Sequence, residues 1–273
     1  MKDTPIQDSS SDLPEETAAH YDLFFGPVYF EPYALELVKR IDSGRSSIVL
    51  EIGAGTGRVT RHIRENIPSS AKLIASDIDR EMLAIAKRKL GHLDINWQNI
   101  NALQLPFNDN SIDLVVCSFG YMFVPDKPKA FAEACRVLKP GGLLLFTTWD
   151  KLENNGASYT SRTIAERYLE EPIPESYNLA TSMSNQAEIA FLLEDAGFIE
   201  HSIETIQLQA VCRTAEEAAN GLVSGPVYAE IKKRNPAWIS EIKVKLKNEL
   251  AEKYGSAPMI APMSAVLTQA WKR

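Results

Sequence analysis

Short apolar runs and amphipathic stretches alternate along the chain between residues 47 and 149. The apolar runs, each bounded by turn residues, are SSIVLEI, AKLIASDI, INWQNI, SIDLVVCSF and GLLLFTTW. Runs of this length predict strands, and those without strict alternation are typical of strands buried on both faces. Because most of them are followed by helical spacing, the pattern predicts βαβ units and a parallel sheet with helices on both faces.

Three stretches between these runs are predicted to be helices. RVTRHIREN stops at Pro68, and DREMLAIAKRKLG has a capping residue at Asp79 and ends at Gly91. The positions of KPKAFAEACRVL that are expected to face inward are Ala130, Phe131, Ala134, Val137 and Leu138. A sharp turn at KPGG then leads into the last of the five strands.

The N-terminal region has two parts. Residues 1–15 are rich in Ser, Asp and Pro and are predicted to form a disordered tail. The stretch that follows, ETAAHYDLFFGPVYFEPYALELVKRID, has helical spacing, with Leu35, Val38 and Ile41 on one face and a helix start at Glu31 before a proline. It is rich in aromatic side chains, which must be buried or bind something.

Beyond residue 149 the pattern is looser. NQAEIAFLLEDAGF predicts a helix, IEHSIETIQLQAV a strand, residues 214–253 a charged helical region, and MSAVLTQAWK a last strand. The composition is that of an ordinary soluble globular protein.

Charge and cysteine content narrow the function classes. The chain has 29 Lys and Arg against 36 Asp and Glu, a net charge of −7, which disfavours a nucleic-acid partner because such binding depends on neutralising phosphates. The three cysteines and four histidines are scattered without metal spacing, so no metal site is predicted. No apolar run approaches the roughly 20 residues of a membrane span, and the N-terminus has no signal-peptide core, so we expect a cytoplasmic protein.

The stretch VLEIGAGTGRVT carries the strongest chemical signal. Gly53, Gly55 and Gly57 follow the first strand, where glycine allows positive φ and a close approach of ligand to backbone. A dinucleotide loop would have its third glycine at the position of Arg58, and Glu51 would repel a pyrophosphate. A ligand with a carboxylate for the loop N–H groups and an ammonium for Glu51 fits better, and S-adenosylmethionine is such a ligand.

A second acidic residue fits the same ligand. Asp77 ends the second strand, 77 − 57 = 20 residues beyond Gly57. A carboxylate there can accept both ribose hydroxyls, as in nucleotide-binding βαβ units generally. Taken alone, Asp77 could equally be a helix-capping residue.

Four blocks of the sequence resemble one protein family. VLEIGAGTGRVT resembles motif I of the class I S-adenosylmethionine-dependent methyltransferases, and ASDIDREML resembles their second-strand motif. Residues 101–149 are similar to the stretch shared by the ubiquinone/menaquinone-biosynthesis type and its small-molecule relatives. The leader AAHYDLFFGPVYFEPY is similar to the lead-in of that group. The likeness is close over residues 47–149, and four blocks in the right order are far more specific than motif I alone.

The resemblance and the glycine loop together predict a set of cofactor-binding residues. They are Tyr21, Glu51, Gly53, Ala54, Gly55, Gly57, Asp77, Ile78, Met82, Asn101, Ala102, Ser118 and Phe119. The loop would hold the amino-acid end of S-adenosylmethionine and Asp77 would bind the ribose. Ile78 and Met82 would flank the adenine.

The resemblance also implies roles for the remaining members of this set. Asn101 and Ala102 would meet the adenine edge, and Ser118 and Phe119 would line the path to the sulfonium. Tyr21 would fold over the cofactor, although it could simply be a core residue. Many relatives have Asp where this chain has Asn101; the amide oxygen can still accept from the adenine amine, so binding should survive, with some loss.

The expected fold is α/β, a Rossmann-like seven-stranded and mostly parallel sheet with helices on both faces. The last strand is expected to be antiparallel beside its neighbours, and helical lid insertions are expected. Residues 16–273 are predicted to form a single methyltransferase domain. Within it, residues 16–45 form an N-terminal helical lid, 46–149 the cofactor-binding core, and 150–185 and 212–258 substrate-capping insertions.

The expected activity is methyl transfer from S-adenosylmethionine to a small-molecule acceptor, through an O, N or C atom that the sequence leaves open. CSFGYM follows the fourth strand, where amino-methylating DNA enzymes have an Asn/Asp/Ser-Pro-Pro-aromatic run. No catalytic residue is predicted, because an in-line displacement needs a base only if the acceptor must lose a proton. The alternatives are a non-catalytic S-adenosylmethionine-binding protein and, less favoured, an NAD(P)-dependent oxidoreductase. The oligomeric state is left open.

Overall fold

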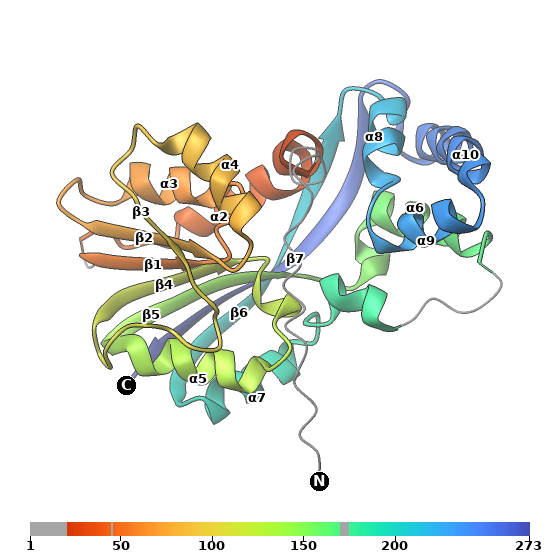
Figure 1. Cartoon of the computed structure of the whole chain (residues 1–273). Coiled ribbons are helices and arrows are strands. Elements are labelled where there is room, and N and C mark those ends of the chain that lie inside the picture. Colours follow the sequence, from red (N-terminus) through yellow and green to blue (C-terminus); the bar gives the residue numbers. More distant parts are fainter. Residues whose placement is uncertain (1–20, 45, 170–174) are drawn as a thin grey trace, which may run out of the picture.

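The protein folds around one seven-stranded sheet with the strand order β3-β2-β1-β4-β5-β7-β6 (Figure 1). The computed structural model describes residues 21–44, 46–169 and 175–273. The strands are β1 (Ile48–Ile52), β2 (Lys72–Asp77), β3 (Asn96–Asn99), β4 (Ile112–Ser118), β5 (Leu138–Trp149), β6 (Phe198–Cys212) and β7 (Met259–Lys272).

Helices connect most of these strands along the chain. The α-helices are α2 (Glu31–Val38), α3 (Arg58–Asn66), α4 (Arg80–Leu90), α5 (Lys127–Val137), α6 (Gly156–Glu166), α7 (Gln186–Asp195), α8 (Ala215–Leu222), α9 (Pro226–Arg234) and α10 (Pro236–Tyr254). A π-helical segment η1 (Tyr21–Phe30) leads into α2, and the short 3-10 turns are η2 (Tyr121–Phe123), η3 (Leu152–Asn154) and η4 (Glu175–Thr181).

The direction of the strands confirms the predicted sheet. β3, β2, β1, β4 and β5 pair in parallel. β7 lies between β5 and β6 and is antiparallel to both, as expected for the last strand. The pairing of β6 with β7 runs from Phe198 opposite Lys272 to Cys212 opposite Met259, so this pair continues past the end of β5.

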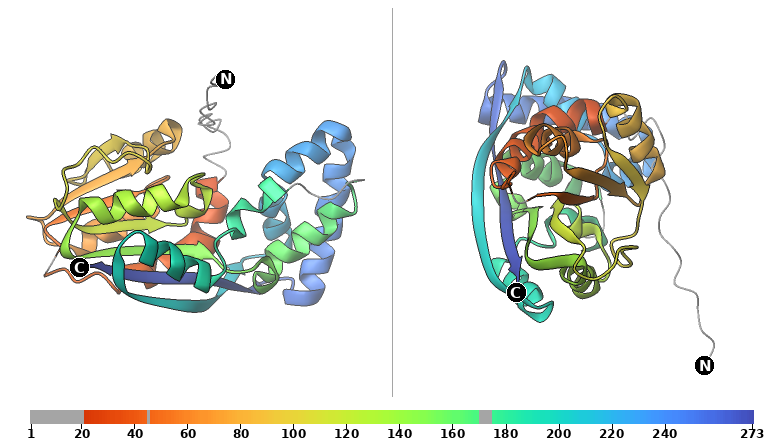
Figure 2. Two further views of the ribbon diagram at one scale, coloured as in Figure 1. Left: turned by 90° about the horizontal axis from the view of Figure 1, so that it is seen from below. Right: turned by 90° about the vertical axis from the view of Figure 1, so that its left-hand side faces the viewer.

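Both faces of the sheet are covered by helices (Figures 1 and 2). Val49 of β1 and Leu114 of β4 pack in a cluster with α2 and α3. Their sequence neighbours Leu50 and Val115 point to the opposite face and pack in the main cluster, which includes α5 and α7. Burial on both faces explains why the apolar runs of the sequence do not alternate strictly with polar residues.

The inward face of α5 is as predicted, whereas that of α2 differs. The five predicted inward positions between 130 and 138 are all fully buried. In α2, Leu35 is 44% exposed, and the buried residues are Tyr33, Ala34 and Leu37, followed by Ile41. Helical spacing permits two adjacent apolar stripes here, and packing on α3 and the sheet selects the one that contains Leu37.

The predicted sharp turn at KPGG is wrong in detail, because these residues lie inside β5 as an irregularity. The pairing partners change from Ile112 opposite Leu138 to Leu114 opposite Leu143, which leaves extra residues on the β5 side. Gly141 has a φ of +77° and accommodates this bulge. The strand therefore begins earlier than its apolar run suggests.

The far ends of β6 and β7 carry a helical lobe formed by α6, α8, α9 and α10 (Figure 1). The Tyr228 hydroxyl lies 2.6 Å from the Ser161 hydroxyl, which ties α9 to α6. The N-terminal segment η1 lies between this lobe and α4, and its Phe24 ring packs so closely on Gly221 of α8 that a Cβ there would collide with it. These helices fall within the ranges predicted as capping insertions; the functional division of the domain stays a prediction. No helix of the described residues is long and apolar enough to cross a membrane.

Candidate cofactor site

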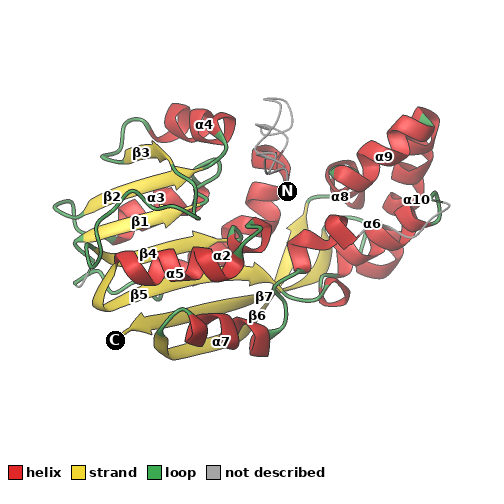
Figure 3. Ribbon diagram, turned by 60° about the horizontal axis from the view of Figure 1, so that its bottom comes forward, coloured by secondary structure: helices red, strands yellow, loops and turns green. Residues whose placement is uncertain are grey.

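The predicted site residues gather at one edge of the sheet. Parallel strands present their carboxyl ends on the same side, so the segments after β1, β2, β3 and β4 lie next to one another (Figure 3). These segments contain the glycine loop, Asp77 with Ile78, Asn101 with Ala102, and Ser118 with Phe119. The side chain of Tyr21 falls outside the described residues, although its backbone begins η1.

The glycine loop has the backbone that only glycine adopts easily. Gly53, Gly55 and Gly57 have φ values of +71°, +54° and +83°. Gly57 also precedes α3, and a Cβ on it would lie 2.8 Å from Leu90 Cδ1 and 3.1 Å from Ala86 Cβ. The third glycine therefore lets α3 begin tightly against α4, and the N-terminal N–H groups of α3 face the loop.

Glu51 is a buried carboxyl group directly before this loop. Its side chain is 1% exposed, and among the described residues its Oε2 atom has no hydrogen-bond partner. Burial raises the pKa of Glu51 to about 8, and the nearby charge of Asp77 adds to the rise. A buried oxygen without a partner fits a ligand that brings a hydrogen-bond donor or a positive charge.

Asp77 connects the end of β2 to the glycine loop. Its Oδ2 accepts the Gly55 N–H at 2.7 Å, and its Oδ1 accepts the Asp79 N–H at 2.9 Å. Burial raises the pKa of Asp77, and these backbone hydrogen bonds oppose the rise. A carboxylate has about four acceptor positions, so it retains capacity for two hydroxyls. The cap of α4 is Asp79, which accepts the N–H groups of Glu81 and Met82.

The residues expected around an adenine differ in accessibility. Ile78 is 46% exposed, whereas Met82 is 8% exposed and packs with Ile85. Asn101 is exposed, and its side-chain oxygen accepts the Leu103 N–H at 2.9 Å. That oxygen keeps a second lone pair for a ligand, so the departure from the family's Asp leaves an acceptor in place.

Phe119 follows β4 in an unusual backbone conformation. Its φ is +53°, and its N–H donates to the Thr147 carbonyl at 2.9 Å. Its ring stacks on Trp149 with the centroids 4.2 Å apart. Ser118 lies beside it, with its hydroxyl 3.1 Å from that of Thr147. A non-glycine residue held in the left-handed region is often found at functional sites.

The N-terminal segment covers this aromatic pair. The rings of Phe30 and Tyr33 meet Phe119 edge-on at 5.3 Å and 5.6 Å, and Tyr29 meets Trp149 at 6.5 Å. Sequence reasoning missed Trp149 as a site residue. Its signal was its position as the last residue of an apolar strand, at the same sheet edge as Phe119.

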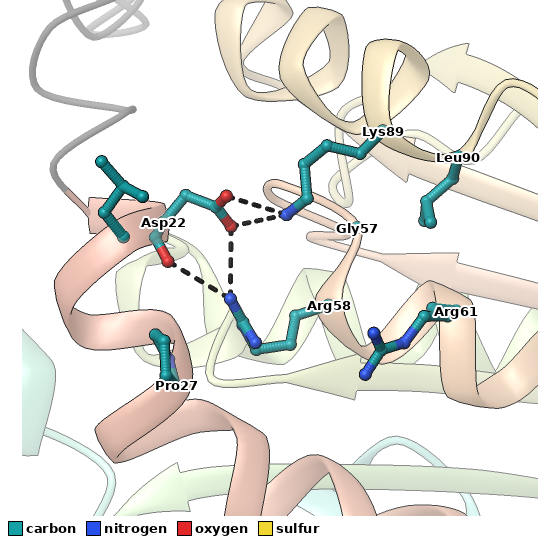
Figure 4. Close-up of a pocket in the computed structure, with 8 residues that line it drawn as sticks. Asp22, Pro27, Gly57, Arg58, Arg61, Lys89 and Leu90 are labelled. Atoms are coloured by element: carbon teal, nitrogen blue, oxygen red, sulfur yellow. Dashed lines mark hydrogen bonds and ion pairs between the residues drawn. The ribbon is translucent and has the colours of Figure 1, made fainter.

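Sequence reasoning also missed two contacts of Asp22 in the N-terminal segment, one with the glycine loop and one with α4. The Thr56 hydroxyl donates to Asp22 Oδ1 at 2.6 Å, and Lys89 Nζ donates to the same carboxylate at 2.7 Å. A cavity of about 240 Å³ adjoins them, and the residues that line it include Arg58 and Arg61 (Figure 4). Nothing in the local sequence around Asp22 indicates these partners.

The described residues provide both polar and aromatic contacts at the site. Within the described part of the chain, no group of three His, Cys, Asp or Glu side chains is arranged to hold a metal ion. Tyr33 packs on Trp149 with the ring centroids 5.5 Å apart, and Asp150 follows Trp149 in the chain. Burial raises the pKa of Tyr33 well above its usual range. Asp150 accepts from Lys151, Asn154 and Ser264, and the pKa of its carboxyl is lowered despite its burial.

The chain is similar to known methyltransferases. Residues 50–146 match the family described as a methyltransferase domain. The ubiquinone/menaquinone biosynthesis C-methyltransferase UbiE of Francisella philomiragia is 36% identical over 141 residues, which are 49% of this chain and 56% of that protein. The chain thus spans little more than half the length of this curated relative.

Two solved structures share the fold. The YcgJ protein of Bacillus subtilis has a TM-score of 0.58 at 19% identity, and the match covers 89% of this chain and 99% of that one. Haemonchus contortus phosphoethanolamine N-methyltransferase 2, in complex with phosphomonomethylethanolamine and S-adenosylhomocysteine, has a TM-score of 0.59 at 17% identity, covering 95% of this chain and 58% of that one.

The sheet order, the glycine loop and the family match define a class I S-adenosylmethionine-dependent methyltransferase domain. Within that class, the domain is similar to that of the ubiquinone/menaquinone biosynthesis C-methyltransferases, and S-adenosylmethionine is the cofactor of the class. The resemblance stated from the sequence is confirmed.

Proposed function

We propose that this protein transfers a methyl group from S-adenosylmethionine to a small-molecule acceptor at the carboxyl edge of β1, β2 and β4. The observation that carries the proposal is the buried Glu51 carboxyl, whose Oε2 has no partner among the described residues, directly behind a loop of left-handed glycines. The residues present fit the cofactor. An ammonium group satisfies Glu51, and a ribose finds the remaining acceptor positions of Asp77.

The proposed binding roles follow from the site's chemistry. The N–H groups of the glycine loop and of the start of α3 would hold the cofactor's carboxylate, because a helix N-terminus favours an anion. Ile78 offers an exposed apolar surface for the adenine. Asn101 offers an amide oxygen at its edge. When bound, S-adenosylmethionine supplies an activated methyl group on a positively charged sulfur.

We propose that the acceptor binds beside the Phe119–Trp149 pair. Methyl transfer disperses charge in the transition state. The protein can therefore accelerate the reaction mainly by aligning the acceptor with the methyl group and by excluding water. The aromatic residues of η1 and α2 provide a water-excluding cover on this side. An acceptor that must lose a proton would need a base other than these two groups, since the pKa of the Tyr33 phenol is raised and the pKa of the Asp150 carboxyl is lowered.

The comparisons support a small molecule as the acceptor without choosing its atom. The curated relative is named a C-methyltransferase of quinone biosynthesis, and one structural neighbour is named an N-methyltransferase. We therefore leave the acceptor atom open between carbon, nitrogen and oxygen. The net charge of −7 supports the exclusion of nucleic acid, and the cytoplasmic location stays a prediction.

The test uses the full-length purified protein with methyl-labelled S-adenosylmethionine. Binding is measured by calorimetry, and transfer is measured by incubation with a small-molecule extract, followed by separation of labelled products. Binding with transfer to an extractable small molecule supports the proposal. Binding without transfer to any fraction would favour the non-catalytic alternative, and absence of binding would overturn the cofactor assignment.

A further inference from the structure

The Asp22 carboxylate of the N-terminal segment reaches across to the glycine loop and to α4. Asp22 Oδ1 accepts from the Thr56 hydroxyl at 2.6 Å. The Asp22 carboxylate also accepts from Lys89 Nζ at 2.7 Å and 2.9 Å (Figure 4). Lys89 Nζ also donates to the Thr56 carbonyl at 3.2 Å. Thr56 stands between the last two glycines of the loop, so Asp22 and Lys89 hold both its side chain and its backbone.

A second group of charges binds the same segment to α3. Glu31 accepts from Arg58 Nη1 at 2.7 Å and from Arg61 Nη2 at 2.9 Å. Arg58 also donates to the Asp22 carbonyl at 3.2 Å. The guanidinium lies so close to Gly26 that a Cβ there would collide with it. The N-terminal segment is thus seated closely on the start of α3.

The Asp22 carboxylate is largely sheltered from solvent, whereas Lys89 is exposed. The Asp22 and Lys89 side chains are 16% and 36% exposed. Burial alone would raise the pKa of Asp22, but the hydrogen bonds from Lys89 and Thr56 and the charges of Lys89 and Arg58 lower it. The carboxylate is therefore stable in its charged form, and charge-assisted hydrogen bonds of this kind are stronger than neutral ones.

We propose that Asp22 and Lys89 are positioning residues for the cofactor: they clamp Thr56 and keep the glycine-loop N–H groups aimed at the ligand. We call Asp22, Thr56 and Lys89 the Asp22 clamp. The inference rests on the proposed function, because it assigns the clamp to the affinity for S-adenosylmethionine. It also couples the docking of the N-terminal segment to the ordering of the glycine loop, because the Asp22 carboxylate takes part in both.

The first measurement is the affinity of full-length variants for S-adenosylmethionine by calorimetry. Asp22→Asn is expected to weaken binding about tenfold, equivalent to about 1.4 kcal/mol. Lys89→Met is expected to do the same, and the double variant should lose little more than either alone, because both act on Thr56. Asp22→Glu, which keeps the charge, should recover part of the loss.

The control is Glu36→Gln. This carboxylate lies on α2 and pairs with Lys39 at 2.6 Å and with Arg40 at 3.5 Å, so its described partners lie outside the loop and its loss should leave cofactor affinity unchanged. Circular dichroism and thermal melts establish that each variant is folded. Unchanged affinity of folded Asp22→Asn, or an equal loss in Glu36→Gln, would overturn the clamp while leaving the proposed function intact.

A second measurement needs no cofactor. Hydrogen exchange of the amides in residues 53–57 should be faster in Asp22→Asn than in the unaltered protein, and unchanged in Glu36→Gln. If the unaltered protein fails to bind S-adenosylmethionine, the proposed function fails and with it the role of the clamp toward that ligand. Equal exchange in Asp22→Asn and the unaltered protein would overturn the mechanical part of the inference as well.

Discussion

At the scale of single residues, the site combines two buried carboxyl groups with different surroundings. Asp77 is engaged by the N–H groups of Gly55 and Asp79. Glu51 is almost fully buried and its Oε2 lacks a partner among the described residues. Burial therefore raises the pKa of Glu51 to about 8, so that it holds its proton at neutral pH until a positive charge arrives.

We predict that S-adenosylmethionine binding releases a proton from Glu51. The ammonium of the ligand favours the ionised carboxylate, so the affinity should rise as the pH increases from 6 toward about 8. Calorimetry at pH 7 in buffers of different ionisation enthalpy measures the released proton. Glu51→Gln should bind more weakly and lose the pH dependence. Identical binding enthalpies in all buffers would refute the linkage.

The second prediction at this scale concerns the ribose. Asp77→Ala should weaken binding by about 1.5–3 kcal/mol, the usual range for hydrogen bonds to a charged group. Part of this loss would come from the loop, because Asp77 also holds the Gly55 N–H. Titration calorimetry on the folded variant measures the change. An unaltered dissociation constant would show that Asp77 does not bind the ribose.

At the scale of elements, the junction of β1, the glycine loop and α3 decides whether the site forms. Gly57 requires glycine for two reasons, its φ of +83° and its close contact with Leu90 and Ala86 of α4. Gly141 in the β5 irregularity has a similar φ of +77°, but a Cβ there would meet no atom within 4 Å. A comparison of substitutions at Gly57 and Gly141 therefore distinguishes the cost of backbone strain from the cost of a steric clash with α4.

We predict that Gly57→Ala destabilises the protein more than Gly141→Ala does. The strain of a left-handed alanine costs about 1 kcal/mol at either position, and displacement of α4 adds roughly 1–3 kcal/mol at Gly57. Urea unfolding of the ligand-free variants provides the comparison. Equal losses of unfolding free energy in the two variants would show that the contact with α4 has no energetic weight.

At the scale of the whole molecule, the N-terminal segment joins the sheet to the helical lobe. Its charged residues contact α3 and α4, its aromatic residues cover Phe119 and Trp149, and Phe24 packs on Gly221 in α8. A ligand under this cover contacts elements from the whole core. Its binding should therefore stabilise the entire fold and not only the loop.

We predict that S-adenosylmethionine raises the melting temperature and that NAD does not. At about 100 times the dissociation constant, binding adds about 2.7 kcal/mol of stability. For a chain of this size, each kcal/mol corresponds to a shift of roughly 2–4 °C. Differential scanning fluorimetry with the two ligands measures the effect. An equal shift with NAD would return the oxidoreductase alternative to consideration.

Local signals in the sequence determined most of the cofactor-binding core. The apolar runs define the strands, and Asp79 caps α4 because its carboxylate can accept the first N–H groups of the helix. The spacing of the glycines and the position of Glu51 indicate the chemistry of the ligand. These features depend on residues within a few positions of one another, so their physics is visible in the sequence alone. The strand pattern and the family resemblance together predicted the sheet with its antiparallel last strand, which the structure confirms.

Only the tertiary structure decided the features that depend on distant contacts. Helical spacing alone could not choose between the Leu35 and Leu37 stripes of α2, and the conformation of KPGG depends on its pairing with β4. Asp22 and Lys89 stand 67 positions apart, and neither carries a local sign of the other. The covering of the Phe119–Trp149 pair likewise arises when separate segments meet. Such partners are selected by packing of the whole chain, which no local pattern records.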